Sequence, residues 1–223
     1  MTIRHKAWKE PLDIGLASEW NDDHWADFTD ELLNVWLFPS HVLPADFTTD
    51  VSGTASIDTE MSSNHNWLDM ETGATGSSVA SLRLGDTDTT NKLDLPVATF
   101  AINAEDVDLA EFGLFTFANT PFTANQKGIY FRMKTGKVYA VTGDGADETE
   151  TEIGNYDQFS QYMLVVSSTN VKFYTEDLST LRATHTTNIP TDDLTLKVSI
   201  KNQTADNRIL KSDGISLMRL RVK

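Results

Sequence analysis

From about residue 47 onward, hydrophobic and polar residues alternate along the chain with a period of two. This period places successive side chains on opposite faces of an extended strand. Glycine, asparagine, aspartate and serine interrupt the pattern at short, fairly regular intervals, as turns do. The pattern predicts a dozen strands, over residues 67–71, 79–84, 97–103, 112–118, 128–133, 138–142, 148–153, 162–167, 171–174, 181–186, 194–201 and 215–222.

Many short strands with almost no helical period between them predict an all-β chain of two antiparallel sheets packed face to face. Two stretches, MKTGK and SSTN, are typical of tight hairpins, because Gly136 and Asn170 tolerate a positive φ. No fixed-period repeat and no low-complexity linker divides this region. Residues 45–223 are therefore expected to form one sandwich.

The first 44 residues differ from the rest in tryptophan content and in hydrophobic spacing, and they are expected to form a short N-terminal arm. They contain four of the five tryptophans, Trp8, Trp20, Trp25 and Trp36. The stretch ASEWNDDHWADFTDELLNVW predicts one amphipathic helix, with Ser18 as its cap and apolar residues at helical spacing, Trp25, Phe28, Leu32 and Leu33. So short a helix cannot bury these aromatic residues by itself. We expect it to pack on the sandwich or on another chain, with Trp8, Trp20, Trp25, Phe28 and Trp36 as interface residues.

Composition narrows the classes of partner. The formal net charge is -15 among 223 residues, and no local basic patch is visible. Such a surface repels phosphate backbones, so we expect no nucleic-acid partner. No stretch of 18 apolar residues occurs, so no membrane insertion is expected. The chain lacks cysteine, which excludes disulfides and thiolate chemistry.

The order of motifs from Trp67 to the C-terminus resembles the concanavalin A-like lectin/glucanase, or LamG-type, jelly roll. The stretches that carry the resemblance are LDMETGATGSSVASLRL, KGIYFRMKTGKVYAVTGDG with the following T-x-T-x-I strand, YMLVVSSTNVKFYTEDLSTLRATHTTNIP and KNQTADNRILKSDGISLMRL. The resemblance covers about 150 residues and implies a jelly-roll sandwich. The opening LASEWNDDHWADF resembles the start of many phage and archaeal-virus structural proteins, although any helix that closes a sandwich would fit it equally well.

The stretch ETETEI raises the question of catalysis. Its alternation places Glu148, Glu150 and Glu152 on one face of a strand, similar to the acidic motif of glycan hydrolases with this jelly roll. The central acid is glutamate instead of aspartate, no tryptophan lies nearby, and little near the row is apolar enough to raise a carboxyl pKa. We therefore interpret the row as a solvated strand face and predict no catalytic residue.

Two further kinds of site remain open. GDGADE places Asp144 and Asp147 in a tight loop that suits calcium, although an ordinary solvated turn explains it too. A sugar site would use an aromatic side chain beside polar ones. The candidates for ligand binding are Trp67, Asn155, Tyr156 and Asp157.

The first hypothesis is a non-enzymatic virion structural protein: a capsid turret, spike or decoration, or a tail component. Its arm would join it to other copies of itself and to other virion proteins, while the jelly roll binds host surface glycans. The start of the chain lacks the apolar run of a signal peptide, so we expect synthesis in the host cytoplasm and a place on the virion surface. The alternative is a carbohydrate-binding module or lectin with calcium as its cofactor, and a glycoside hydrolase ranks third.

Overall fold

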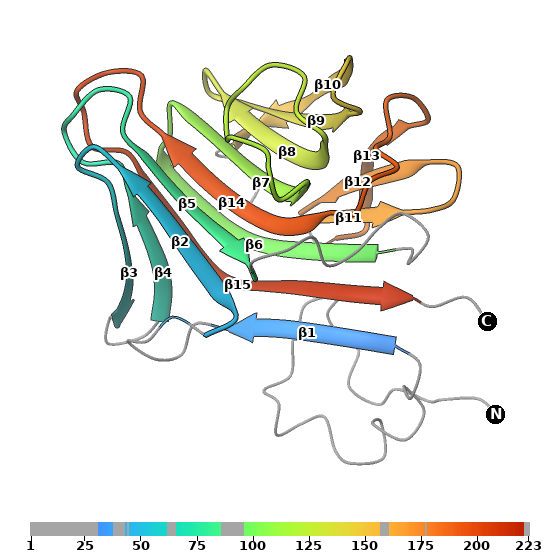
Figure 1. Ribbon diagram of the computed structural model, residues 1–223, viewed down its shortest axis with the longest axis horizontal. Helices are drawn as coiled ribbons and strands as arrows, with labels where there is room; N and C mark the ends of the chain where they lie inside the picture. Colours follow the sequence, from blue (N-terminus) through green and yellow to red (C-terminus); the bar gives the residue numbers. More distant parts are fainter. Residues whose placement is uncertain are drawn as a thin grey trace, which may run out of the picture.

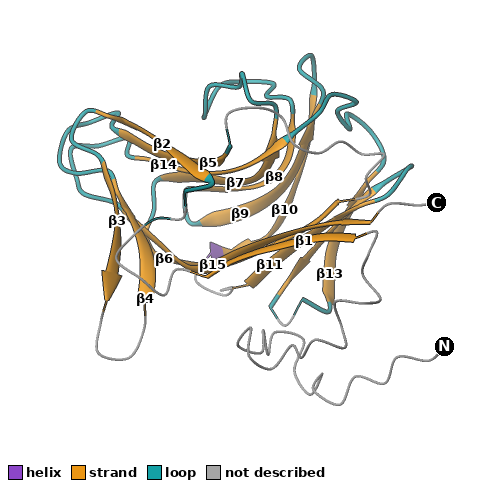
Figure 2. Ribbon diagram, turned by 60° about the horizontal axis from the view of Figure 1, so that its bottom comes forward, coloured by secondary structure: helices purple, strands orange, loops and turns teal. Residues whose placement is uncertain are grey.

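The structure is a computed structural model that describes residues 31–37, 43, 45–61, 66–85, 96–156, 161–176 and 178–220. Two antiparallel sheets lie face to face as two layers (Figures 1 and 2). The seven-stranded sheet contains β2 (Phe47–Ser52), β5 (Val79–Leu84), β7 (Leu109–Phe115), β8 (Gly128–Lys134), β9 (Lys137–Gly143), β10 (Glu148–Asn155) and β14 (Thr195–Lys201). The eight-stranded sheet contains β1 (Glu31–Leu37), β3 (Ser56–Met61), β4 (Asn66–Glu71), β6 (Pro96–Asp106), β11 (Gln161–Val166), β12 (Val171–Thr175), β13 (Thr180–His185) and β15 (Ile209–Leu220).

The strand orders are β10-β9-β8-β7-β14-β5-β2 and β13-β12-β11-β6-β15-β4-β3, with β1 paired to β15 beside this path. The predicted all-β sandwich is confirmed. Strands β2 and β3 were not predicted, and β15 begins six residues before the predicted start at residue 215. The predicted hairpin at Gly136 is confirmed, since Thr135 and Gly136 form a two-residue turn in which both φ angles are positive.

The helix prediction is wrong over its last part. Leu32, Leu33 and Trp36 lie in β1, where Trp36 is opposite Ile215 of β15. The spacing of ELLNVWL fits a helix or a strand, and pairing with the long strand β15 decides between them. Residues 1–30, with the rest of the predicted helix, lie outside the described residues. The described part of the chain contains no helix of the length and hydropathy needed to cross a membrane.

Aromatic side chains fill the space between the sheets. Phe112 of β7 stacks on Phe131 of β8 with ring centroids 5.4 Å apart, and Tyr162 of β11 meets the Phe112 ring at 4.9 Å from the opposite sheet. Phe131 meets Phe173 of β12 edge to face at 5.3 Å. All four are fully buried. Each such ring contributes roughly 1.5–3 kcal/mol of burial free energy, so this cluster holds the two layers together.

A histidine links the layers at one end of this core. His185 of β13 lies 3% exposed, with its Nδ1 3.0 Å from the Thr142 hydroxyl and its Nε2 3.0 Å from the Thr151 hydroxyl. Thr142 donates its own hydroxyl proton to the carbonyl of Thr187, so Nδ1 is the donor of the imidazole and Nε2 the acceptor. Burial lowers the pKa of His185 because the site disfavours the charged ring.

Candidate functional site

The glutamates of ETETEI lie on the outer face of the seven-stranded sheet, the face turned away from the core. Thr149 and Thr151 alternate with them and lie opposite Thr142 and Ala140 of β9, both core residues. The three carboxylates therefore share one face, as the period of two predicts.

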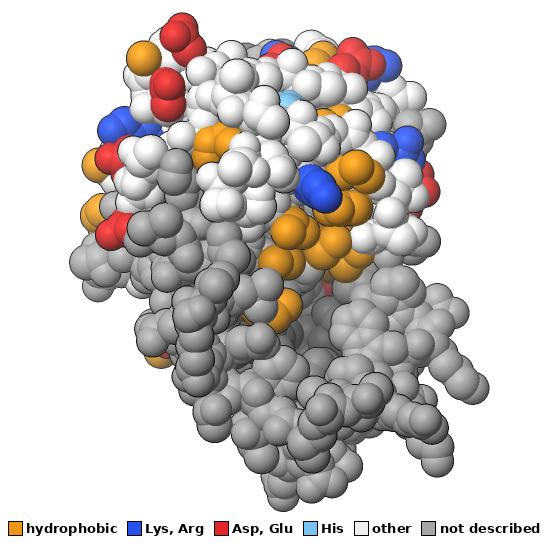
Figure 3. Space-filling model, turned by 90° about the vertical axis from the view of Figure 1, so that its right-hand side faces the viewer, with side chains coloured by type: hydrophobic (Ala, Val, Ile, Leu, Met, Phe, Trp, Pro, Cys, Tyr) orange, Lys and Arg blue, Asp and Glu red, His pale blue; other side chains and the backbone are white. Residues whose placement is uncertain are grey.

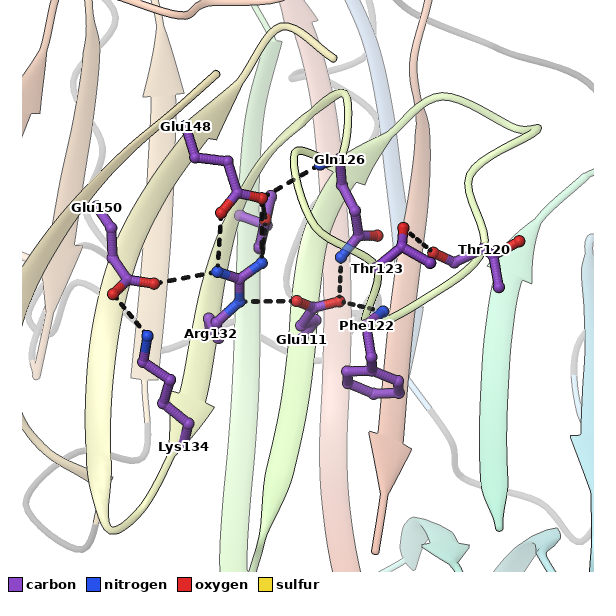
Figure 4. A network of polar contacts seen from close by, with 10 residues as sticks. Glu111, Thr120, Phe122, Thr123, Gln126, Arg132, Lys134, Glu148 and Glu150 are labelled. Atoms are coloured by element: carbon purple, nitrogen blue, oxygen red, sulfur yellow. Dashed lines mark hydrogen bonds and ion pairs between the residues drawn. The ribbon is translucent and has the colours of Figure 1, made fainter. Parts of the chain in front are cut away.

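Arg132 of β8 is the centre of a network on this face (Figure 4). Its Nε donates to Glu111 of β7 at 2.8 Å, and Nη1 donates to both Glu148 and Glu150 at 3.0 Å. Nη2 donates to the Tyr130 hydroxyl at 2.6 Å, and that hydroxyl donates to Glu148 at 2.8 Å. Three strands of the sheet, β7, β8 and β10, thus meet at one guanidinium.

The network fixes the charges of its members. Burial alone would lower the pKa of Arg132, but hydrogen bonding to Glu148 and the charge of Glu111 outweigh it and hold that pKa above its ordinary value. Burial alone would raise the pKa of Glu148, but hydrogen bonds from Arg132 and Tyr130 lower it instead. The pKa of Tyr130 is raised, first by burial. At neutral pH the site holds an arginine cation and a glutamate anion in close contact.

A loop between β7 and β8, residues 116–127 and here called the strap, lies over this network. The backbone N–H of Phe122 donates to Glu111 at 3.0 Å, and the Gln126 side chain donates to the same carboxylate oxygen at 2.7 Å (Figure 4). The backbone N–H of Gln126 also donates to Glu148 at 3.2 Å. Glu111 is consequently 1% exposed. The strap supplies the hydrogen bonds that a buried carboxylate needs.

The strap extends over β14 and β5 as well. Lys197 donates from its Nζ to the backbone carbonyl of Asn119 at 2.8 Å, and Arg83 lies over the Phe117 ring at 4.4 Å. Gly143 lets the strap approach β9, because a Cβ there would lie 2.1 Å from the carbonyl oxygen of Gln126. A small residue on the strand is therefore a condition for this close contact.

The interpretation of ETETEI as a solvated face is wrong for its first member. The side chain of Glu148 is 16% exposed and held by Arg132, whereas Glu152 is half exposed and pairs with Lys137 at 3.0 Å. Glu150 is intermediate and bridges Arg132 and Lys134. Burial increases along the row toward the strap, a gradient that only the fold creates.

No family model matches the sequence, and no match is found among curated proteins. Solved structures do match. A protein of unknown function from Shewanella oneidensis superposes with a TM-score of 0.62 at 12% identity, over 86% of this chain and 88% of that one. The β-glucanase of Bacillus licheniformis gives 0.59 at 12% identity, over 83% and 97%. The VIP36 exoplasmic/lumenal domain in its Ca²⁺/Man2-bound form gives 0.57 at 10% identity, over 85% and 88%.

The chain has the concanavalin A-like lectin/glucanase fold. The predicted jelly-roll resemblance is thereby confirmed for the fold. Identities this low show the fold alone, so the chemistry must be argued from the residues of this chain.

Within this concanavalin A-like sandwich, the outer face of β8, β9 and β10 lies beyond the strap and is partly open. Tyr139 of β9 is half-buried there, with the Nζ of Lys134 4.4 Å from its ring centroid. Glu150 accepts from Lys134 at 2.7 Å. The ammonium lies over the ring, and the charged groups around it give this surface several hydrogen-bonding groups.

The structure does not bring the predicted ligand residues together. Trp67 lies in β4, near one edge of the eight-stranded sheet, whereas Asn155 ends β10 at the edge of the other sheet beyond β9 and β8. Tyr156 is half-buried and packs against the core. Asp157 lies outside the described residues.

The predicted calcium loop is a closed turn. Asp144 accepts with one carboxylate oxygen from the backbone N–H groups of Ala146 and Asp147, both at 2.9 Å. These bonds lower the pKa of Asp144. Asp147 is exposed. Among the described residues, no group of three or more His, Cys, Asp or Glu side chains is placed to hold a metal ion.

The predicted interface residues Trp8, Trp20, Trp25 and Phe28 lie outside the described residues, and only the backbone of Trp36 is placed, in β1. Conversely, the sequence analysis missed Arg132, Glu111 and the strap. One signal was available: Glu111 is a lone charge within LAEFGLF, an otherwise apolar run. A charge inside a buried strand requires a partner, although the sequence does not say which.

Proposed function

We propose that this chain is a non-catalytic carbohydrate-binding domain, lectin-like in function as well as in fold. The observation that carries the proposal is the engagement of the acidic row by Arg132. Glu148, the most buried acid of the row, is hydrogen-bonded by both Arg132 and Tyr130. It is therefore an anion that the protein already neutralises.

Glycoside hydrolysis needs a carboxylic acid that stays protonated until it donates to the leaving group, which requires a raised pKa. The pKa of Glu148 is lowered. Glu150 accepts hydrogen bonds from Arg132 and Lys134, so a water or sugar would have to displace them. These contacts favour binding over hydrolysis, although β-glucanases share the fold.

The open surface around Tyr139 supports sugar binding better than the predicted residues do. A sugar would stack on its ring in place of the Lys134 ammonium, and Glu150, Glu152 and Lys137 lie around it with groups that hydrogen-bond to hydroxyls. The fold neighbour VIP36 was solved with Ca²⁺ and Man2 bound, which makes mannose-containing glycans the first ligands to test here.

The test is a glycan array followed by calorimetry on the whole chain, with Tyr139→Ala as the site variant. Tyr174→Ala, which removes a half-buried tyrosine from the other sheet, is the matched control. The proposal expects binding that only Tyr139→Ala abolishes. Release of sugars from β-glucan by the wild type, lost in Glu148→Gln, would replace it with the hydrolase function.

A further part of the proposal is where the domain is displayed and what it contacts. We propose that the domain is displayed on a virion surface, as a turret, spike, decoration or tail component, where it contacts further copies, other virion proteins and host surface glycans. Its net charge of -15 and the tryptophan-rich arm of residues 1–44 support this. Oligomerisation through the arm predicts a mass above 24.8 kDa by light scattering at high protein concentration, which reverts to that of a monomer in Trp20→Ser with Trp25→Ser, a variant that leaves β1 in the sheet.

Calcium dependence belongs to the same proposal. It is supported by the calcium-bound fold neighbour, and not by a cluster of ligands among the described residues. Adding EDTA during the calorimetry decides it: affinity that falls and returns with Ca²⁺ supports a cofactor role, and unchanged affinity removes calcium from the proposal.

A further inference from the structure

The outer face of the eight-stranded sheet carries a group of apolar side chains where β15, β6, β11, β12 and β13 run side by side. Alternation along these strands turns one set of side chains into the core and the other outward. The outward set forms two rows across the sheet, linked by the strand register. Thr99, Lys172, Thr184 and Ser216 are the polar members of these rows. The apolar members, here called the apolar face, are Val97, Met163, Val165, Tyr174, Leu181 and Met218.

The apolar face is accessible in the described part of the chain. Leu181 is 49% exposed, and it and Val51 are the two exposed large hydrophobic side chains among the described residues. The other five members of the apolar face are partly exposed. At this end of the molecule, apolar side chains gather beside a lysine or arginine (Figure 3). Contiguous apolar surface of this kind marks a site of contact with another segment or molecule.

The position of β1 indicates what covers this face. β1 begins at Glu31, opposite Leu220 near the end of β15. Two residues later Leu33 lies opposite Met218, which pairs with Val97, which in turn pairs with Val165. The chain therefore enters the sheet at the same end as the apolar face, and thirty residues precede that entry point.

We infer that residues 1–30, here called the N-terminal segment, dock on the apolar face of their own chain. The N-terminal segment is long enough to cross the apolar face. The distance from β1 across β15, β6 and β11 to β12 is four strand spacings, about 19 Å. A helix over residues 19–30 alone would span about 18 Å, with further residues before it.

The chemistry of the two surfaces matches. The N-terminal segment carries Trp20, Trp25 and Phe28, large side chains that need an apolar surface. Four of the other eight residues from 20 to 30 are acidic, Asp22, Asp23, Asp27 and Asp30, and none is Lys or Arg.

Lys172 lies beside Val165 in the same row of the sheet, and no other described residue forms an ion pair with it. An amphipathic segment with acids on one side would bury its rings on the face and place a carboxylate near this lysine. Attachment through β1 makes the contact intramolecular, with an effective concentration about millimolar, so docking on the same chain precedes docking on another.

The inference does not depend on glycan binding. In the free protein the N-terminal segment packs on the apolar face, which shields its aromatic residues from water. On assembly, a partner protein takes the place of that face. The strap performs the corresponding covering role on the other sheet, with contacts that the structure shows.

The experiment is hydrogen exchange on the full chain at low micromolar concentration, with light scattering on the same samples. Met163→Lys with Leu181→Lys places two charges on the apolar face. Val51→Lys, which changes the other exposed large hydrophobic residue, on β2, is the matched control. We expect amides of residues 20–30 to exchange about tenfold faster in the double variant and unchanged in the control.

A second double variant changes the N-terminal segment instead of the apolar face, so that misfolding of the sandwich cannot explain the result. Trp25→Ser with Phe28→Ser leaves the sandwich untouched and should raise binding of an apolar dye, an increase that Met163→Lys with Leu181→Lys abolishes. Wild-type amides at 20–30 that exchange freely would overturn the inference. Protection found only in a dimer and lost on dilution would also overturn it, because the occupied face would then belong to a second copy.

Discussion

The two outer faces of the sandwich bear opposite chemistry and are covered in different ways. The seven-stranded sheet carries Glu111, Arg132 and Lys197 on its outer face, where Glu111 and Lys197 are buried under the strap and the Arg132 side chain is 12% exposed. The eight-stranded sheet carries apolar side chains outward, and Leu181 is half exposed. Figure 2 shows the strands of the two layers in orange and the loops that connect them in teal.

The difference teaches what each kind of face requires. Charges can be buried only if every one finds a partner, so the strap must contribute backbone N–H groups and the Gln126 amide at fixed positions. An apolar face requires area and no particular hydrogen bond. The loops beside it are short, residues 167–170 and 176–179, and cannot fold back over the strands as the strap does.

Arg132→Met should have the largest effect on the charged face. It would leave Glu111 and Glu148 buried without their cation, at a cost of about 3–5 kcal/mol in the free energy of unfolding. Urea denaturation measures it. Adding Glu111→Gln should recover part of the loss, because one of the stranded charges disappears. A loss below about 1 kcal/mol in the single variant would mean that the network behaves as an exposed one.

Gly143→Ala tests the contact between strap and sheet. The added Cβ would lie 2.1 Å from the Gln126 carbonyl oxygen, so the strap must move, at a cost of about 1–3 kcal/mol. Faster exchange of the Phe122 and Gln126 amides should accompany it. Gly76→Ala is the control, since its Cβ would meet nothing nearer than 3.8 Å. Equal behaviour of the two variants would show that the strap is not seated as described.

Between the faces, His185 should make stability depend on pH. Its folded pKa is lowered below the unfolded value of about 6.5, so the neutral ring's contribution is complete above pH 6.5 and is lost as pH falls below it. One such group gives a slope of at most about 1.4 kcal/mol per pH unit. Chemical denaturation between pH 5 and 7.5 measures this slope, in a range above the carboxyl titrations.

The matched variant is His185→Gln, which keeps a neutral hydrogen-bonding side chain beside Thr142 and Thr151. It should lose the slope over this range. A slope that persists in His185→Gln would assign the titration to another group.

Lys137→Met should have the smallest effect. Its pair with Glu152 joins side chains that are 41% and 50% exposed, so solvent screens it and the expected loss is about 0–1 kcal/mol. High salt should remove even that difference. If this change costs as much as Arg132→Met, the contrast between covered and open parts of the acidic row does not hold.

Sequence patterning predicted much of the strand content but little of the site. Period-two alternation located β8, β9 and β10 almost to the residue, and it placed Glu148, Glu150 and Glu152 on one face. It failed at ELLNVWL because that spacing fits a helix and a strand equally. It also grouped Trp67 and Asn155 as predicted ligand residues although the fold places them in separate sheets, because residue type carries no information about proximity.

The sequence by itself determined the all-β character, the turn at Gly136 and the common face of the acidic row, since these depend on neighbours within a few residues. Only the tertiary structure decided that Arg132 pairs with Glu148 and Glu150, that the strap buries Glu111, and that β1 joins the eight-stranded sheet. The physical reason is that a buried charge or an edge strand is satisfied by partners outside its own strand, 21 residues away for Glu111 and Arg132 and almost the whole chain away for β1 and β15. Their approach depends on how the whole chain packs.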